Sequence, residues 1–162
     1  MKQVQGMAHL EAWDVRRYLT RIFGFGGWDF EIRESAMVSH VAEERQKKSG
    51  GGSYVAHTVI YRVTGRLVVR DLNGFRLAHW DDAATGDGPN QPSLADAHDL
   101  ALKTAVSQAL KRCAVNLGDQ FGLSLYNNGS TDPVVLQTLA GPPKARNTDE
   151  NGDTVIGLGE AP

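Results

Sequence analysis

Two β-rich runs that meet at Asn73-Gly74 constrain the fold of this chain most strongly. Residues 54–80, YVAHTVIYRVTGRLVVRDLNGFRLAHW, are rich in Val, Ile, Tyr and Thr on both sides of that dipeptide. Asn-Gly is the favoured pair for a two-residue type I′ hairpin turn. The sequence therefore predicts a long β-hairpin. Its expected cross-strand pairs are Leu72 with Phe75, Arg70 with Leu77, and Arg66 with Asp81.

Side chains alternate between the two faces of a strand, so the first run divides into an apolar and a basic set. The apolar set, expected in the core, is Val55, Val59, Tyr61, Val63, Leu67 and Val69. The opposite set is Arg62, Thr64, Arg66 and Arg70. Arginines four residues apart on a strand are separated by about 13 Å, roughly the span of two nucleotides, so the row can follow a phosphate backbone. The alternative is an ordinary solvated face, although only Asp71 and Asp81 are expected nearby.

Helical patterns flank the β segment. Apolar residues at helical spacing predict a first helix over 7–24, with Gly24 as its stop, and alternation around Trp28 predicts a strand over 27–44. A second, longer helix is expected from the capping residue Ser93 to Gly118. Its apolar sector is predicted to hold Leu102, Val106, Ala109, Leu110, Cys113 and Leu117, and its polar sector Lys103, Thr104, Ser107, Gln108, Lys111 and Arg112.

The order helix, strand, strand, strand, helix predicts an α+β domain: a three-stranded antiparallel sheet with a long hairpin and a long helix packed on it. Residues 45–53 and 81–92 are rich in Gly, Ser and Pro and are expected to be loops. The domain is expected to cover residues 1–126. Residues 127–162 are expected to form a flexible acidic tail.

The charge of the chain is unevenly placed. The net charge is −2, but residues 1–126 hold 15 Lys and Arg against 14 Asp and Glu, whereas 127–162 hold two against five. Residues 45–80 contain seven cations and only Asp71 as an acid, which makes the centre of the chain locally basic. A single cysteine, Cys113, the lack of a leader and the lack of an apolar run long enough to span a bilayer favour a soluble cytosolic protein.

The sequence gives less support to a catalytic function than to nucleic-acid binding. The segment Asp81–Asp99 offers carboxylates and His98 for a metal-dependent nuclease, but its glycines and prolines favour an exposed linker. The remaining histidines, His9, His40, His57 and His79, show no metal-ligand spacing. Neither a cofactor nor a metal is predicted, and the chain is expected not to be an enzyme.

Three elements together resemble the Rad52/Rad22 family of single-strand annealing proteins, over roughly residues 8–126. They are FGFGGWDFEI (23–32), the Asn-Gly hairpin, and ALKTAVSQALKRCAVNLGDQFG (101–122). The resemblance implies a ring-forming homo-oligomer whose groove, between the hairpin stem and the long helix, holds the backbone of single-stranded DNA with the bases turned outward. Lys111 and Arg112 would contact the strand there, although cations at a helix C-terminus also suit the helix dipole without any ligand.

Two positions depart from the family pattern. Val115 stands where relatives often carry a further arginine, and Asp14 stands where an arginine is expected in the first helix, leaving Arg16 or Arg17 as substitutes. Tyr61, Trp80, Trp28 and Phe30 are expected in the core, so the site would read phosphates without an aromatic platform. The predicted DNA-binding residues are Lys111, Arg112, Arg62, Arg66, Arg70, Lys103, Arg16 and Arg17.

The function implied by the resemblance is ATP-independent annealing of complementary strands in homologous recombination and double-strand break repair. Candidate partners are a single-strand-binding protein or an exonuclease, with no membrane involved. A compact phage or bacterial form, acting near the nucleoid in the cytoplasm, is expected. A double-stranded-RNA-type module has the same element order, but it needs lysines at the start of its second helix, where this chain has Ser93, Asp96 and Asp99.

Overall fold

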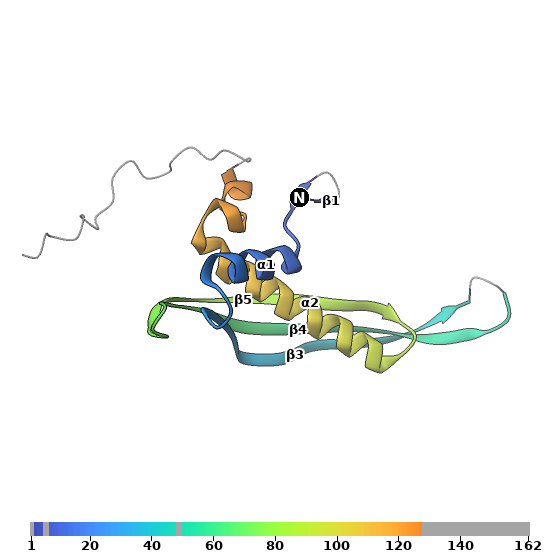
Figure 1. Cartoon of the computed structure of the whole chain (residues 1–162). Coiled ribbons are helices and arrows are strands. Elements are labelled where there is room, and N and C mark those ends of the chain that lie inside the picture. Colours follow the sequence, from blue (N-terminus) through green and yellow to red (C-terminus); the bar gives the residue numbers. More distant parts are fainter. Residues whose placement is uncertain (1, 5–6, 48–49, 128–162) are drawn as a thin grey trace, which may run out of the picture. The chain divides into compact units, whose positions relative to one another are not determined.

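The long helix α2 lies along one face of a three-stranded antiparallel sheet (Figure 1). The computed structural model describes residues 2–4, 7–47 and 50–127. The strand order is β3-β4-β5, which places β4 in the centre, and a two-stranded sheet, β1-β2, precedes the first helix. The expected α+β fold is therefore confirmed. The elements are β1 (Lys2–Val4), β2 (Met7–His9), α1 (Ala12–Phe23), β3 (Trp28–Gln46), β4 (Ser53–Arg70), β5 (Arg76–Gln91), α2 (Leu94–Ala114) and three short 3-10 turns (Val115–Leu117, Asp119–Phe121 and Leu123–Asn127).

The segment 81–92 is not a turn-rich connection, as the sequence predicted, because residues 81–91 form the larger part of β5. It pairs with β4 as far as Gln91, opposite His57. The two glycines that suggested a turn serve another purpose, because they let α2 approach the strand closely. A Cβ at Gly86 would lie 2.2 Å from the backbone nitrogen of Ala105, and one at Gly88 would lie 2.1 Å from the carbonyl oxygen of Ala97.

The helix meets these glycines with a stripe of alanines. The sector predicted for α2 is correct at its C-terminal end, where Ala109, Leu110 and Cys113 are fully buried. It is wrong further towards the N-terminus, where Leu102 is exposed. Only small side chains fit so close to β5, so the buried positions of this half are alanines spaced four residues apart: Ala97, Ala101 and Ala105.

The hairpin between β4 and β5 has a longer turn than predicted. The backbone N–H of Asp71 donates to the carbonyl of Phe75 at 2.9 Å, and the N–H of Gly74 donates to Asp71 at 3.0 Å. Gly74 has a φ of 83°, whereas Asn73 does not enter the positive-φ region that a type I′ turn requires of both residues. The turn is thus a three-residue loop ending in a glycine bulge.

The carboxylate of Asp71 holds this loop by accepting hydrogen bonds from the backbone N–H groups of Asn73 and Phe75, at 2.9 and 2.8 Å. The bulge shifts the register beside it. The predicted pair Arg66 with Asp81 is confirmed, but Arg70 lies opposite Arg76 instead of Leu77.

Helix α1 closes the core at the C-terminal end of α2. Val15 and Leu19 of α1 are fully buried against Leu67, Leu110 and Cys113, with Phe121 covering them from the 3-10 turns. Gly24 ends the helix as predicted, because its N–H donates to the carbonyl of Thr20.

Several boundaries and faces differ from the prediction. The first helix begins at Ala12, because residues 7–9 pair with residues 2–4 as a strand instead. The predicted loop 45–53 is shorter, since β3 extends to Gln46 and β4 begins at Ser53. Val55, predicted in the core, is exposed because α2 does not cover that end of β4. The predicted tail, residues 127–162, lies outside the described residues except for Asn127.

Candidate nucleic-acid interface

A groove runs over the edge strand β5 and is bordered by cations from two different elements. Its volume is about 490 Å³, and it is lined by Arg62 of β4, Gln108 and Arg112 of α2, and residues 83–85 of β5. The β5 residues at its floor are small, namely Ala83, Ala84 and Thr85. The floor is therefore open to a chain-like ligand that follows the strand edge, with a guanidinium group on each side.

Arg112 occupies this position because it lies in the last turn of α2, beside β5. Its Nε donates to Oδ1 of Asp82 at 3.0 Å, and about half of its side chain remains exposed. Arg112 also lines a second hollow of about 250 Å³ together with Asp82, Val115 and Leu123. Val115, which stands where a further arginine was expected, therefore lies next to this cation and adds an apolar wall instead of a charge.

Lys111 precedes Arg112 in the sequence but has a different environment. It is partly buried, and burial lowers the pKa of its ammonium group, an effect that the nearby carboxylate of Glu11 opposes. Lys111 does not line the groove of Arg62 and Arg112. The adjacent pair is thus divided, with Lys111 facing the start of α1 and Arg112 facing β5.

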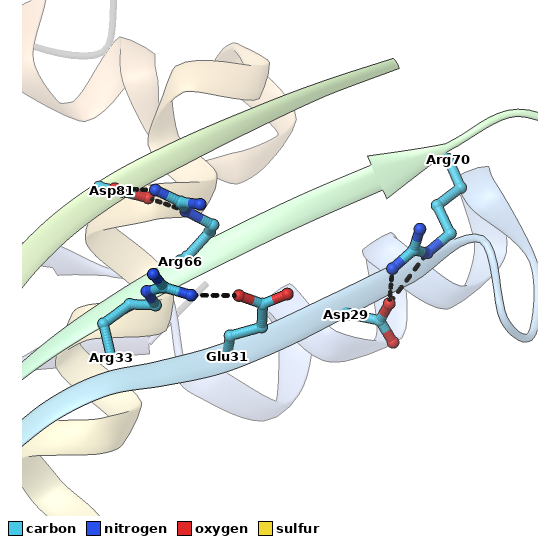
Figure 2. A network of polar contacts seen from close by, with 6 residues as sticks. All are labelled: Asp29, Glu31, Arg33, Arg66, Arg70 and Asp81. Carbon is cyan, nitrogen blue, oxygen red and sulfur yellow. Dashed lines mark hydrogen bonds and ion pairs between the residues drawn. The ribbon is translucent and has the colours of Figure 1, made fainter. Parts of the chain in front are cut away.

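The row of arginines on β4 is paired with acids throughout. Arg66 donates to both oxygens of Asp81, at 2.6 and 2.7 Å, and Arg70 donates twice to Oδ2 of Asp29, at 2.9 and 2.6 Å (Figure 2). Arg62 donates to Glu34 at 3.1 Å. The hydrogen bonds between Arg66 and Asp81 are the main reason why the pKa of Arg66 is raised and the pKa of the Asp81 carboxyl is lowered.

The expectation that few acids lie near this row is wrong. Strand β3 contributes Asp29, Glu31 and Glu34 to the same face. Figure 2 shows Asp29 with Arg70, and Glu31 accepting from Arg33 at 3.2 Å. The sequence could not reveal these partners, because they come from a strand that is distant in the chain and whose register contains a bulge after Ile32. The face is a balanced network of opposite charges, and only Arg62 of the row also borders the groove.

The other predicted site residues lie apart from the groove. Lys103 forms an ion pair with Asp99 one helical turn away, at 2.6 Å. Arg17 pairs with Asp14 at 2.8 Å, and its guanidinium lies over the rings of Trp13 and Tyr18 at 4.7 and 5.2 Å. Arg16 is exposed on α1. The structure therefore brings Arg62 and Arg112 together, and does not bring Lys103, Arg16 or Arg17 to them.

Two kinds of residue at this end of the sheet were missed by the sequence reasoning. Gln108 lines the groove one turn before Arg112, and that four-residue spacing on the polar face of the helix was the available signal. Phe25, Leu72 and Phe75 are strongly exposed although the sequence gives no reason to place them outside. The aromatic residues expected inside, Tyr61, Trp80, Trp28 and Phe30, do pack against the buried clusters.

The acids of β5 do not form a common metal site. Asp81 and Asp82 are neighbours on a strand and point to opposite faces, where they pair with Arg66 and Arg112 respectively. Within the described part of the chain, no group of three or more His, Cys, Asp or Glu side chains is arranged to hold a metal ion. The geometry gives the nuclease alternative no support.

An antiparallel sheet with one long helix and an arginine-bordered groove at its edge defines a class of small α+β domains with a basic edge site. The family model described as "Rad52/22 family double-strand break repair protein" matches residues 1–138. The chain belongs to the Rad52/Rad22 family. This is the family that the three sequence elements resembled.

Curated relatives agree with this assignment. The chain is 31% identical over 121 residues to the "DNA repair and recombination protein RAD52" of Saccharomyces cerevisiae and to that of Kluyveromyces lactis, and 30% identical to "DNA repair and recombination protein rad22" of Schizosaccharomyces pombe. Each alignment covers 75% of this chain but only 22 to 24% of the relative. The chain thus spans less than a quarter of the length of these relatives. None of the helices in the described residues is long and apolar enough to cross a membrane.

Proposed function

We propose that this domain binds single-stranded DNA and anneals complementary strands without ATP, as its part in recombination and double-strand break repair. The observation that carries the proposal is the groove over β5, where Arg62 and Arg112 stand on either side of a floor of small residues. Guanidinium groups bind phosphates through paired N–H donors and keep their charge at any physiological pH.

The lining of the groove favours backbone binding over base binding. The described residues that line it include guanidinium, amide, hydroxyl and methyl groups but no aromatic ring. Proteins that stack bases on aromatic rings cover the bases, whereas contacts to phosphates leave the pairing edges accessible. A strand held in this way can meet its complement while it stays bound, which is the requirement for annealing.

A single groove of this size contacts only a few nucleotides, so the proposal includes assembly into a ring. Joining grooves of neighbouring subunits raises the effective concentration of each further contact. We assign the contacts between subunits to exposed apolar side chains on the hairpin and around the first helix, namely Leu72, Phe75, Leu77, Trp13, Ile22 and Phe25. Head-to-tail contacts between two such different surfaces are the kind that close into rings.

The test is the substitution Arg112→Ala, with Arg45→Ala as the matched control. Both residues are exposed arginines that form an ion pair, Arg112 with Asp82 and Arg45 with Glu43, but Arg45 lies at the far end of β3, outside the groove. Fluorescence anisotropy with a labelled oligonucleotide should show at least about tenfold weaker binding for Arg112→Ala, because losing a hydrogen bond to a charged group costs about 1.5 kcal/mol or more.

Annealing of complementary oligonucleotides, followed without nucleotide, should slow in parallel for Arg112→Ala and stay unchanged for Arg45→Ala. Equal losses in both variants would mean that net charge, and not the groove, determines binding. Undiminished annealing by Arg112→Ala would refute the assignment of the groove.

A further inference from the structure

The sheet brings together two histidines that the sequence keeps apart. His40 on β3 and His57 on β4 are diagonal neighbours on the face that carries α2, since His40 lies opposite Val59 and His57 opposite Ala42. Nε2 of His40 is 3.1 Å from Nδ1 of His57, and their ring centroids are 5.3 Å apart. Both rings can be reached by solvent.

A third imidazole, from α2, lies beside this pair. The ring centroid of His98 is 6.3 Å from that of His40. Nδ1 of His98 is 2.9 Å from the hydroxyl oxygen of Tyr61, which fixes the orientation of the ring. His98 flanks the pair, but among the described residues these three side chains are not arranged to hold one ion. Three elements thus contribute imidazoles to one place at the surface.

The spacing of the first two nitrogens suits one shared metal ion. Imidazole nitrogens bind Zn²⁺ at about 2.0 to 2.1 Å, so two of them lie about 2.9 Å apart at a right angle and about 3.3 Å apart at the tetrahedral angle. The observed 3.1 Å falls between these values. The same distance allows a hydrogen bond between the rings, and a modest turn of either exposed ring directs both lone pairs to a common point.

We propose that His40 and His57 form an open binding site for a divalent transition-metal ion of the Zn²⁺, Ni²⁺ and Cu²⁺ class. Imidazole is a preferred ligand of these ions, unlike Mg²⁺ and Ca²⁺, which select oxygen. The described residues hold no set of three or more acidic, histidine or cysteine side chains that encloses an ion. The site therefore has two protein ligands, and water completes the coordination. None of these residues lines the DNA groove, so the inference stands apart from the proposed function.

A bound ion would link β3 to β4 in the half of their hairpin that is closed by the loop between Lys47 and Gly52. Since β3 is an edge strand and α2 packs on β4 and β5, this end of β3 has few other tertiary contacts. The ion would restrain β3 beside the N-terminal part of α2, whose His98 lies near His40.

The test is isothermal titration of the untagged full chain with ZnCl₂ in a buffer that does not chelate metal. The wild type should bind one ion per chain at this site, and its melting temperature should rise with Zn²⁺. His40→Ala and His57→Ala should each weaken this binding at least about tenfold, the minimum expected for a ligand. His79→Ala is the matched control, because His79 is exposed on β5 opposite Val68 and has no imidazole partner among the described residues; it should bind Zn²⁺ like the wild type.

His40→Gln and His57→Gln, which keep a polar side chain of similar size, provide a second pair of variants if an alanine variant loses its fold by circular dichroism. Equal Zn²⁺ affinity in the wild type and in the variants at positions 40 and 57 would overturn the proposal. The absence of any Zn²⁺ binding by the wild type would overturn it as well.

Discussion

Arg62 and Arg112 line the same groove although they come from a central strand and from the end of a helix on the other face of the sheet. Arg62 reaches it from the outer face of β4, and Arg112 reaches it from the helix side, past Asp82. Each guanidinium is about half exposed, at 52% of its side-chain area. Because β5 is an edge strand, side chains from both faces of the sheet can reach the same groove there.

Binding of single-stranded DNA should be strongly dependent on salt. If phosphate contacts dominate, the logarithm of the association constant should fall linearly with the logarithm of salt concentration, with a slope of about −0.7 per contact. Anisotropy titrations from low to moderate salt measure this slope. In Arg112→Ala the slope should become less steep by about 0.7, the value for one lost contact. Affinity that does not change with salt would rule out binding through the phosphate backbone.

Within the arginine row, Arg62→Ala should reduce DNA affinity more than Arg70→Ala. Arg62 borders the groove and makes one hydrogen bond to Glu34, whereas Arg70 is held by two hydrogen bonds to Asp29 and lies near the hairpin turn. Neither change should alter stability much, because exposed ion pairs contribute only about 0 to 1 kcal/mol. A larger loss of DNA affinity for Arg70→Ala would place the binding surface along the arginine row near the hairpin, and not at the groove.

Gly86→Ala should destabilise the fold, by at least about 2 kcal/mol, because its methyl group would overlap the backbone of α2 at Ala105. Chemical denaturation measures the free energy of unfolding. The control is Asp87→Ala at the next position, whose side chain is exposed on the other face and should change stability by no more than about 0.5 kcal/mol. Similar effects of both substitutions would contradict the close helix-strand contact.

Cys113 should resist thiol reagents in the native protein. Its side chain is fully buried, its Sγ donates to the carbonyl of Gly65 at 3.5 Å, and burial raises the pKa of the thiol, so the reactive thiolate is scarce at neutral pH. The pKa of Cys113 is higher in the folded state than in the unfolded state. The contribution of the buried neutral thiol to the free energy of unfolding is therefore present at neutral pH and is lost as the pH rises through the raised pKa. Reaction with Ellman's reagent should be slower than in denaturant by at least about two orders of magnitude. A rapid native reaction would show that this part of the core opens readily.

Phe75→Asp should disrupt assembly and weaken DNA binding together. Phe75 is largely exposed at the hairpin, so a charge there should leave the monomer folded but oppose an apolar contact with a neighbour. Size-exclusion chromatography with light scattering measures the oligomer, and Leu100→Asp, an exposed position on α2, is the control. A monomeric Phe75→Asp protein that anneals as fast as the wild type would refute the need for a ring.

The strands and helices could be predicted because their signals are local. The Ser93 cap and the Gly24 stop depend on residues close in the sequence, and both are confirmed. Strand β5 could not be recognised in the same way. Its residues from Asp82 onwards have low β propensity, and they form a strand because β4 satisfies their backbone hydrogen bonds and α2 fits over Gly86 and Gly88.

The site was only partly predictable for a related reason. Arg62 and Arg112 could be selected from spacing and helix position, but their meeting depends on β5 being a strand. The acids that pair with the arginine row, such as Asp29 and Glu34, and the contact of His40 with His57 depend on the register of β3 with its two bulges. A shift by one residue would turn each of these side chains to the other face.

The contact of α2 with Gly86 and Gly88 has a mechanical consequence. Where α2 crosses these two glycines, its distance from β5 is set by main-chain atoms and alanine methyl groups, which have no rotamers to change. The helix that carries Arg112 therefore has little freedom to move towards β5, the strand that forms the floor of the groove. We therefore expect the fit between DNA and the groove to be adjusted by the DNA strand and by the ends of the Arg62 and Arg112 side chains.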